Sequence, residues 1–431
     1  MKLTVFHSAD GDCLLLTSHD ARHALVDGGR ASTFVANTWP RLRDMAAAGE
    51  ELDLVVVSHI DADHIAGVNW LLGAAMDWAM FDHQRGPGGN PDVSEPEVDR
   101  PPTIHKVWHN AWTAVMGDLA GPVASLATRV TVARNQGLAK GATGPALAVF
   151  DAFEDIATSI PHGVQLRQTI ADVGIPRNTP FPDNVLLNPT TPHIEQLGET
   201  TLTVLGPTRQ NLERLREDWR IWILGLETSS GAAARLQSSA EDALTALTLA
   251  EDAALVASVF TAARVLHSTD PKQVTPPNRA SITLLAEEGS RTCLLTGDAN
   301  ESELLEGLRA AGKINGAPFH CNVLKVQHHG SEHNLSTQFT DMVVADNYVF
   351  CADGNNDNPD PSVVKTIVEA HLHASAQVPA TLWFNCSVER TKDSRRPALR
   401  AAIQEARRIE KRPDCFVRVL DDQAPAFELE V

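Results

Sequence analysis

The sequence predicts an α/β fold of layered strands and helices that two insertions interrupt. Short apolar runs bounded by turn residues, such as the run at 52–58, are typical of buried strands. Segments with helical spacing, such as 300–312 and 361–375, separate the later strands. Of the 431 residues, 43% are hydrophobic and 21% are charged, so the chain can bury an ordinary core without disulfide or metal staples.

The expected elements follow from these patterns in chain order. In the first half we expect a helix near 33–48, interrupted by Pro40, and strands at 3–6, 13–18, 23–27, 52–58 and 103–110. In the second half we expect helices at 300–312 and 361–375 and strands at 201–207, 280–288, 291–298, 322–327, 347–352 and 380–385. The Pro, Gly and acidic residues of 84–102 predict a surface loop.

We expect one elaborated domain over residues 1–431, because the last strands are expected to complete the same sheet. Two largely helical or loop insertions, at about 81–198 and 208–275, interrupt it. The second insertion is rich in Ala, Leu, Glu and Arg at helical spacing and carries Trp219 and Trp222. Core packing or a protein interface is the default interpretation of this insertion, and an aromatic platform for bases is the alternative.

Charge and cysteine content exclude several classes of protein. The chain has 36 Lys and Arg against 55 Asp and Glu, a net charge of −19, which weighs against coating duplex nucleic acid through bulk charge. A small local basic groove remains compatible with it. Six cysteines without a CxxC pair predict reduced, buried strand thiols. Asp10 and Asp12 precede any signal-type apolar stretch, and no run is long enough to span a membrane, so we expect a cytoplasmic protein.

Four side chains that can bind a metal follow the predicted strand at 52–58 within six residues. They are His59, Asp61, Asp63 and His64. Imidazole and carboxylate groups together suit zinc, manganese or iron. Such a turn could serve two ions, with His59 and Asp61 on one and Asp63 and His64 on the other. The alternative is a polar turn whose acids cap the next helix.

This segment resembles the metallo-β-lactamase superfamily signature His-x-His-x-Asp-His, with Asp61 in place of the second histidine. Other motifs resemble that family in chain order, namely LVDGG at 25–29, LLTGDAN at 294–300 and LKVQHHGSEHNLS at 324–336. The double-histidine form, with GDCLLL at 11–16 and NRASITLL at 278–285, is similar to the ComEC-like branch of soluble hydrolase domains.

The resemblance implies an αββα sandwich and two divalent ions, with zinc as the first choice and manganese as the alternative. It implies that Asp298 bridges the ions and that one of His328 and His329 completes the set of ligands around the second ion. We take His328 as the ligand and give His329 a catalytic role beside Asp63 and Asp298. The expected metal ligands are therefore His59, Asp61, Asp63, His64, His109, Asp298 and His328.

Other positions carry weaker expectations. His109 stands where the family often places a histidine ligand, although it could instead be a satisfied histidine in an aromatic cluster with Trp108 and Trp112. Residues expected to hold the ligands or contact substrate are Asp27, Asn278, Ser281 and Ser331. Lys325 could contact a phosphate, but a lone lysine is usually a solvated surface group.

These features predict a hydrolase that uses a metal-bound hydroxide. Asp61 makes one site richer in oxygen, which favours phosphoesters, so we expect a phosphodiesterase or nuclease acting on nucleic acid or nucleotides. One alternative is an interaction or regulatory component of a multi-protein bacterial defence system, with a degenerate metal site and a partner on the helical insertion. Another is a hydrolase of small thioesters, esters or cyclic nucleotides.

Overall fold

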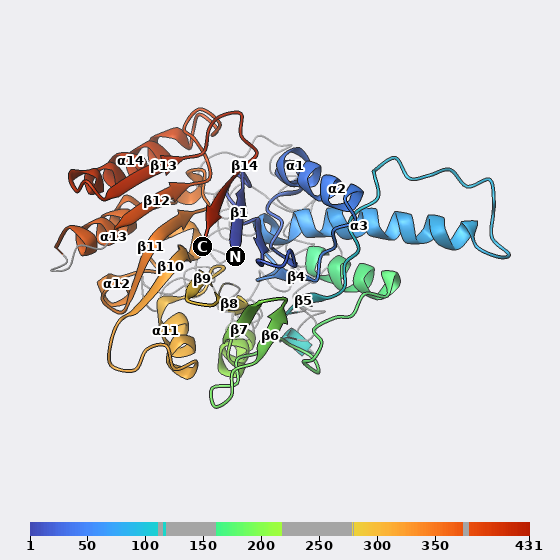
Figure 1. Cartoon of the computed structure of the whole chain (residues 1–431), viewed down its shortest axis with the longest axis horizontal. Coiled ribbons are helices and arrows are strands. Elements are labelled where there is room, and N and C mark those ends of the chain that lie inside the picture. The colour runs from blue at the N-terminus through green and yellow to red at the C-terminus, as the bar shows by residue number, and fades with distance from the viewer. Residues whose placement is uncertain (111–114, 118–160, 218–277, 279, 374–378) are drawn as a thin grey trace, which may run out of the picture.

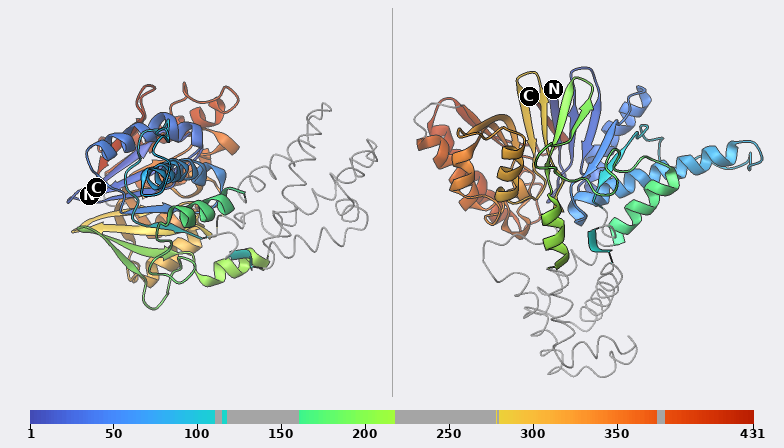
Figure 2. Two further views of the ribbon diagram at one scale, coloured as in Figure 1. Left: turned by 90° about the vertical axis from the view of Figure 1, so that its right-hand side faces the viewer. Right: turned by 90° about the horizontal axis from the view of Figure 1, so that it is seen from below.

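The computed structural model describes residues 1–110, 115–117, 161–217, 278, 280–373 and 379–431. Two β-sheets face each other, and helices cover their outer faces (Figures 1 and 2). Helices α1–α3 lie on one side, and the helices of the C-terminal half lie on the other (Figure 2). The predicted α/β class and the αββα layering are therefore confirmed. Most of the second predicted insertion, and residues 111–114 and 118–160 of the first, lie outside the described residues.

Within the described residues the first sheet has six strands, and all of them except the C-terminal β14 come from the first 110 residues. The pairs β14–β1, β1–β2 and β2–β3 are antiparallel, and the pairs β3–β4 and β4–β5 are parallel. In spatial order the strands are β14 (Ala426–Glu430), β1 (Lys2–Phe6), β2 (Leu14–Thr17), β3 (His23–Val26), β4 (Leu54–Val57) and β5 (Val107–His109). The C-terminal strand thus completes the first sheet beside β1.

The second sheet has eight strands in the part of the chain that the structure describes, and it is parallel from β13 to β9 and antiparallel from β9 to β6. Its strands are, in spatial order, β13 (Cys415–Val419), β12 (Ala380–Phe384), β11 (Val343–Phe350), β10 (Phe319–Lys325), β9 (Arg291–Leu295), β8 (Thr283–Glu288), β7 (Thr200–Gly206) and β6 (Ile194–Leu197). The last two expected strands, at 347–352 and 380–385, correspond to β11 and β12 of this sheet, whereas β13 and β14, which were not expected, join different sheets.

Helices connect the parallel strands and cover the sandwich. They are α1 (Ala31–Thr33), the π-helix η1 (Phe34–Thr38), α2 (Trp39–Ala47), α3 (Ala62–Arg85), α11 (Glu301–Ala310), η4 (Gln327–Gly330), α12 (Thr337–Met342), η5 (Asn355–Asp357), α13 (Pro361–His373), α14 (Arg396–Ala406) and η6 (Arg407–Lys411). Residues 161–173 and 209–217 are also helical. The end of α3 and the loop after it project from the body of the sandwich (Figure 1).

Three clusters of buried apolar side chains hold these layers together. One lies between the sheets and joins Leu14 of the first sheet to Leu284 and Val323 of the second. Another packs the outer face of the first sheet against α2 and α3, and a third packs the second sheet against α11–α14. Alternation along β2 places Leu14 in the inner cluster and Leu15 in the outer one. The six cysteines are buried and free, as expected.

Local sequence explains where some elements begin and end. The helical segment near 33–48 divides at η1, and Pro40 stands in the first turn of α2, where its missing N–H costs nothing. All the buried residues of α3 lie between Ala62 and Ala74, which agrees with the projection of its second half. Among the described residues, no helix combines the length and the apolar composition that a membrane span requires.

Candidate metal centre

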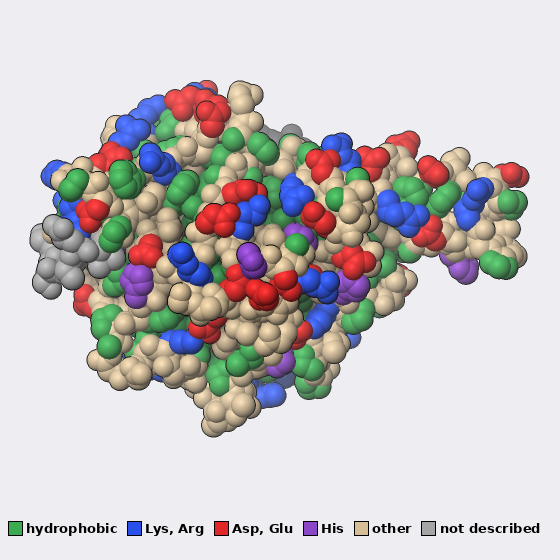
Figure 3. Space-filling view, viewed as in Figure 1, with side chains coloured by type: hydrophobic (Ala, Val, Ile, Leu, Met, Phe, Trp, Pro, Cys, Tyr) green, Lys and Arg blue, Asp and Glu red, His purple; other side chains and the backbone are tan. Residues whose placement is uncertain are grey.

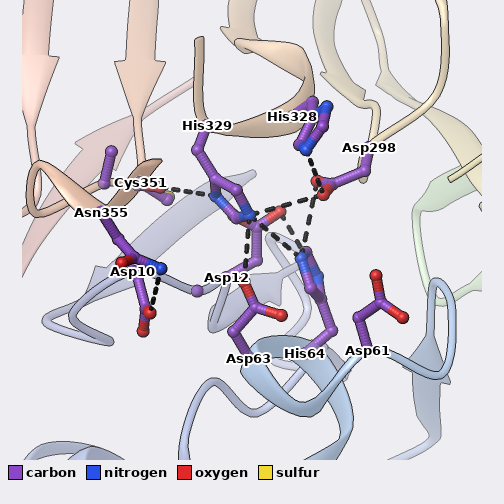
Figure 4. A network of polar contacts seen from close by, with 12 residues as sticks. Asp10, Asp12, Asp61, Asp63, His64, Asp298, His328, His329, Cys351 and Asn355 are labelled. Atoms are coloured by element: carbon purple, nitrogen blue, oxygen red, sulfur yellow. Dashed lines mark hydrogen bonds and ion pairs between the residues drawn. The ribbon is translucent and has the colours of Figure 1, made fainter. Parts of the chain in front are cut away.

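The candidate site lies where the carboxyl ends of parallel strands from both sheets meet. Asp27 follows β3, His64 lies at the start of α3 after β4, Asp298 follows β9, and His329 follows β10. Asp12, from the turn between β1 and β2, lies beside them (Figure 4). Segments distant in sequence therefore bring imidazole and carboxylate groups to one buried point.

The orientation of His64 is set by Asp27. The His64 Nδ1 atom lies 2.9 Å from Asp27 Oδ2, so Nδ1–H donates to this carboxylate. Asp27 is itself held by Ser58, whose backbone N–H and hydroxyl group each donate to it at 2.7 Å. This arrangement directs the lone pair of His64 Nε2 into the centre, as acids behind metal-binding histidines do. Asp27 thus occupies the position that the sequence predicts for it.

His329 is oriented in the same way by a backbone carbonyl group. Its Nδ1–H donates to Cys351 O at 2.7 Å, which leaves a lone pair on Nε2. This Nε2 lies 3.3 Å from His64 Nε2, and it lies 3.4 Å from both Asp63 Oδ2 and Asp298 Oδ2. His64 Nε2 is 3.5 Å from Asp298 Oδ1. The side chains converge in Figure 4.

These spacings are close to the ligand separations of a tetrahedral metal site, although Asp298 faces His64 and His329 with different oxygens. An ion about 2.0–2.1 Å from four ligands separates the ligand atoms by about 3.4 Å. The four measured separations among Asp63, His64, Asp298 and His329 run from 3.3 to 3.5 Å. We call these four residues the tetrahedral group.

A second group surrounds His59, which lies close to both Asp298 and His64. His59 Nε2 is 3.5 Å from Asp61 Oδ2 and 3.7 Å from Asp298 Oδ2. His59 Nδ1 lies 3.0 Å from Ser58 Oγ and 3.4 Å from Ser281 Oγ, so hydroxyl groups fix the ring. His59 Nε2 and Asp298 Oδ1 are buried and have no hydrogen-bond partner among the described residues. Asp298 is therefore common to both groups.

Asp61 does not cap the helix that follows it. It occupies the N-cap position of α3, yet its side chain accepts no capping hydrogen bond. Its carboxylate instead faces His59. The capping interpretation of Asp61 is therefore not supported.

His109 is the last residue of β5 and pairs with Val57 of β4. Val57 precedes His59 by two residues in the chain. His109 is buried, and neither ring nitrogen has a hydrogen-bond partner among the described residues, so the expected alternative of a satisfied histidine finds no support there. Burial and, secondarily, Arg177 and Arg167 lower the pKa of His109 to about 3, which keeps the ring neutral. The groups of potential ligands within the described chain do not include His109, so its role as a ligand stays a prediction.

The double histidine has a strained backbone, since His328 and His329 both have positive φ values, 46° and 55°. These conformations turn the two rings apart. His328 Nε2 lies 3.7 Å from Asp298 Oδ2, and its Nδ1 lies 2.7 Å from Asn334 Oδ1. Asn278 Nδ2 approaches His328 Nε2 at 3.1 Å. His329, not His328, thus joins the tetrahedral group.

The remaining predicted residues differ in what they contact. Ser281 Oγ accepts the backbone N–H of Asp298 at 3.2 Å and also faces His59, so it holds parts of both groups. The hydroxyl group of Ser331 accepts from the backbone N–H of His333 at 3.5 Å.

Lys325 corrects the expectation of a solvated surface group. Its side chain is 0% exposed, and its Nζ lies 2.5 Å from Asp12 Oδ2. The sequence does indicate this burial of Lys325. Leu324 and Val326 flank it at the end of a parallel strand, and such strands are buried on both faces. Asp12 also belongs to a His/Asp group, together with Asp27 and His64.

The charges of this centre leave room for two dications. Asp12, Asp27, Asp61, Asp63 and Asp298 carry five negative charges, of which Lys325 offsets one. Two dications would neutralise the remaining four. The donor set of neutral imidazole and carboxylate groups fits zinc or manganese.

Without metal ions, protons have to compensate for part of this charge. Burial alone would lower the pKa of His329, but Asp298, Asp63 and Asp12 outweigh it and raise the pKa to about 10. Burial likewise would lower the pKa of His64, but Asp298, Asp27 and Asp63 outweigh burial and raise this pKa well above the usual range. Burial would raise the pKa of Asp298, but His329, His64 and His328 hold it well below its usual range.

A comparison with protein families matches part of the chain. The sequence model of the metallo-beta-lactamase superfamily matches residues 9–77, which include Asp12, Asp27 and the segment from His59 to His64. No curated protein matches the chain. The superfamily match, the αββα layers and the His/Asp groups together support a metal-dependent hydrolase that binds divalent ions.

Proposed function

We propose that the protein is a metal-dependent phosphodiesterase of the ComEC-like branch that acts on nucleic acid strands or nucleotides. One observation carries the metal dependence. His64 and His329 each donate Nδ1–H outward, so their Nε2 lone pairs face each other at 3.3 Å. Two neutral imidazoles in this arrangement repel each other unless a cation or a proton lies between them. Asp63 and Asp298 add negative charge at the same point.

Two sets of side chains would hold the ions. Asp63, His64, Asp298 and His329 would hold one, and His59, Asp61 and Asp298 would hold the other, with His109 as a further candidate. Divalent ions bound there would polarise the ester oxygen and activate a water molecule for attack. The chain's own residues fix this arrangement, because Asp27, Cys351 and Ser281 orient the imidazoles and the carboxylate that would serve both ions.

Arg30 supports an anionic substrate. Its Nε and Nη2 donate to the two oxygens of Asp10 at 2.8 and 2.9 Å, which fixes the guanidinium group. Arg30 lies near enough to Asp63 to be one of the cations that, against burial, lower the pKa of that carboxyl group. Its side chain is 36% exposed, so a positive charge lies at the edge of the centre and can meet a phosphate.

The surface supports single strands or nucleotides over long duplexes. The chain has a net charge of −19, and on the face shown in Figure 3 acidic and basic side chains are interspersed, not gathered into a basic stripe. A duplex binder needs many cations along its groove. Asp61 also gives one group more oxygen ligands, which suits phosphoester chemistry with zinc or manganese.

A substrate panel tests this proposal. Protein loaded with Zn²⁺ or Mn²⁺ is incubated with single-stranded and duplex DNA, RNA, cyclic dinucleotides, bis(p-nitrophenyl) phosphate and a p-nitrophenyl carboxylate ester. We expect hydrolysis of the diesters and little hydrolysis of the uncharged ester, because Arg30 favours an anion. Arg30→Gln should lose activity on the diesters while keeping its metal. Turnover of the carboxylate ester alone would contradict the phosphodiester assignment.

Metal binding should release protons and strengthen as the pH rises. The folded pKa of His329, about 10, lies above its ordinary value of about 6.5, so the metal-free ring carries a proton at pH 7. That proton stabilises the metal-free fold fully below pH of about 6.5, and its contribution disappears as the pH rises through about 10. A bound dication displaces it, so the dissociation constant should fall about tenfold per pH unit for each proton displaced between pH 7 and 9. Chelator competition at several pH values measures this, and a flat profile would contradict it.

A further inference from the structure

We propose that Lys325 is a positioning residue that fixes the Asp298 carboxylate between the two groups of metal ligands. This inference rests on the proposed metal centre. Lys325 ends β10, and its side chain is fully buried. Its Nζ donates to Asp12 Oδ2 at 2.5 Å and to Gly297 O at 3.1 Å, and it lies 3.7 Å from Asp298 Oδ1.

The contacts of Lys325 hold Asp298 at two points. The carbonyl group of Gly297, directly before Asp298, accepts from both Lys325 Nζ and the backbone N–H of His328. The Thr296 hydroxyl group also donates to Lys325 O at 2.8 Å, which ties the loop after β9 to the end of β10. The ammonium group therefore constrains both the backbone and one oxygen of Asp298.

The two oxygens of Asp298 consequently have different neighbours. Oδ1 faces Lys325 and His64, at 3.7 and 3.5 Å. Oδ2 faces His329 at 3.4 Å and lies 3.7 Å from both His59 and His328. A rotation of this carboxylate would remove an oxygen from one group or the other. Lys325 opposes that rotation through its ion pair with Oδ1.

A role in charge balance and a role in positioning predict opposite effects on metal affinity when Lys325 is removed. A buried ammonium group close to two dications repels them, so its removal should tighten metal binding if charge were its only contribution. If Lys325 positions Asp298, its removal should instead weaken metal binding, about 10- to 100-fold as for other groups that orient ligands. The sign of the change separates the two roles.

The test compares wild type, Asp12→Asn, Lys325→Met and the double variant Asp12→Asn/Lys325→Met. Metal content after dialysis and zinc affinity by chelator competition are measured, together with the melting temperature of each metal-free protein. Lys325→Met leaves the Asp12 carboxylate buried without its cation and should lower the melting temperature. The double variant lacks that unpaired charge, so it should recover stability yet still bind zinc 10- to 100-fold more weakly. Lys313→Met, which breaks a half-exposed pair with Glu287, is the matched control and should bind zinc normally.

Each outcome decides the inference. Weakened binding in both variants supports positioning, and if Lys325→Met does not fold, the double variant compared with Asp12→Asn supplies the result. Unchanged or tighter binding in Lys325→Met overturns it. So does a double variant that recovers full zinc affinity, because the pair would then serve stability alone. If the wild-type protein binds no metal, the proposed metal-dependent function is wrong, and the proposed role of Lys325 is wrong for the same reason.

Discussion

Asp298→Ala should lose both metal ions and reduce phosphodiester hydrolysis by about 10³-fold or more. Asp298 is the residue that both groups share, with oxygens 3.4 Å from His329, 3.5 Å from His64 and 3.7 Å from His59. Metal ions stabilise the transition state by several kcal/mol, and a loss of about 4 kcal/mol corresponds to about 10³-fold in rate. Metal content per chain and initial rates on bis(p-nitrophenyl) phosphate measure the two effects.

A matched control separates this loss from general damage to the second sheet. Asp346 lies in β11 and bonds to His320 and Asn322, away from the histidines of the centre. Asp346→Ala should therefore keep its metal content and its rate within a few-fold of wild type. If Asp298→Ala retained two ions per chain, the assignment of this residue to both groups would be wrong. An intact metal content with lost activity would restrict Asp298 to the chemical step.

The elements with strong local signals were predictable from the sequence. Buried parallel strands such as β4 consist almost entirely of Val and Leu, so their apolar runs stand out. β10 and β11 begin at Phe319 and Val343, three and four residues before the predicted starts, because polar residues within them interrupt the apolar pattern. The edge strand β6 has only one buried residue and two apolar residues among its four, and it gave no signal. β14 depends on pairing with β1 at the other end of the chain, which no local pattern records.

The site was predictable where a motif is contiguous. The segment from His59 to His64 and the turn at Asp298 could be identified from the sequence because each directly follows a buried strand. Contacts between motifs were not predictable. The burial of Lys325 depends on Asp12, more than 300 residues earlier in the chain, and the support of His329 depends on a carbonyl group of Cys351. The positive φ values of His328 and His329, which decide the direction of each ring, also have no sequence signal in non-glycine residues.

The structure therefore favours exchanging the roles that the sequence analysis gave to the two histidines. We expect His329→Ala to lose about one ion per chain and about 10³-fold in rate, because it removes one corner of the tetrahedral group. His328→Ala should keep both ions, since its Nε2 lies 3.7 Å from Asp298 and 3.1 Å from Asn278 Nδ2, outside that group. Its rate should fall by only about 10- to 100-fold, as for a residue that supports ligands or contacts substrate.

The two variants control for each other. Both residues have positive φ values, so any backbone effect of placing alanine there is shared, and a difference between the variants reports the side chains. Metal content, zinc affinity and rate are measured for both proteins under identical conditions. The original assignment, with His328 as the ligand, predicts the reverse pattern of metal loss. Equal metal loss in both variants would mean that each imidazole binds an ion, with His328 reaching the ion beside His59 through its proximity to Asp298 Oδ2.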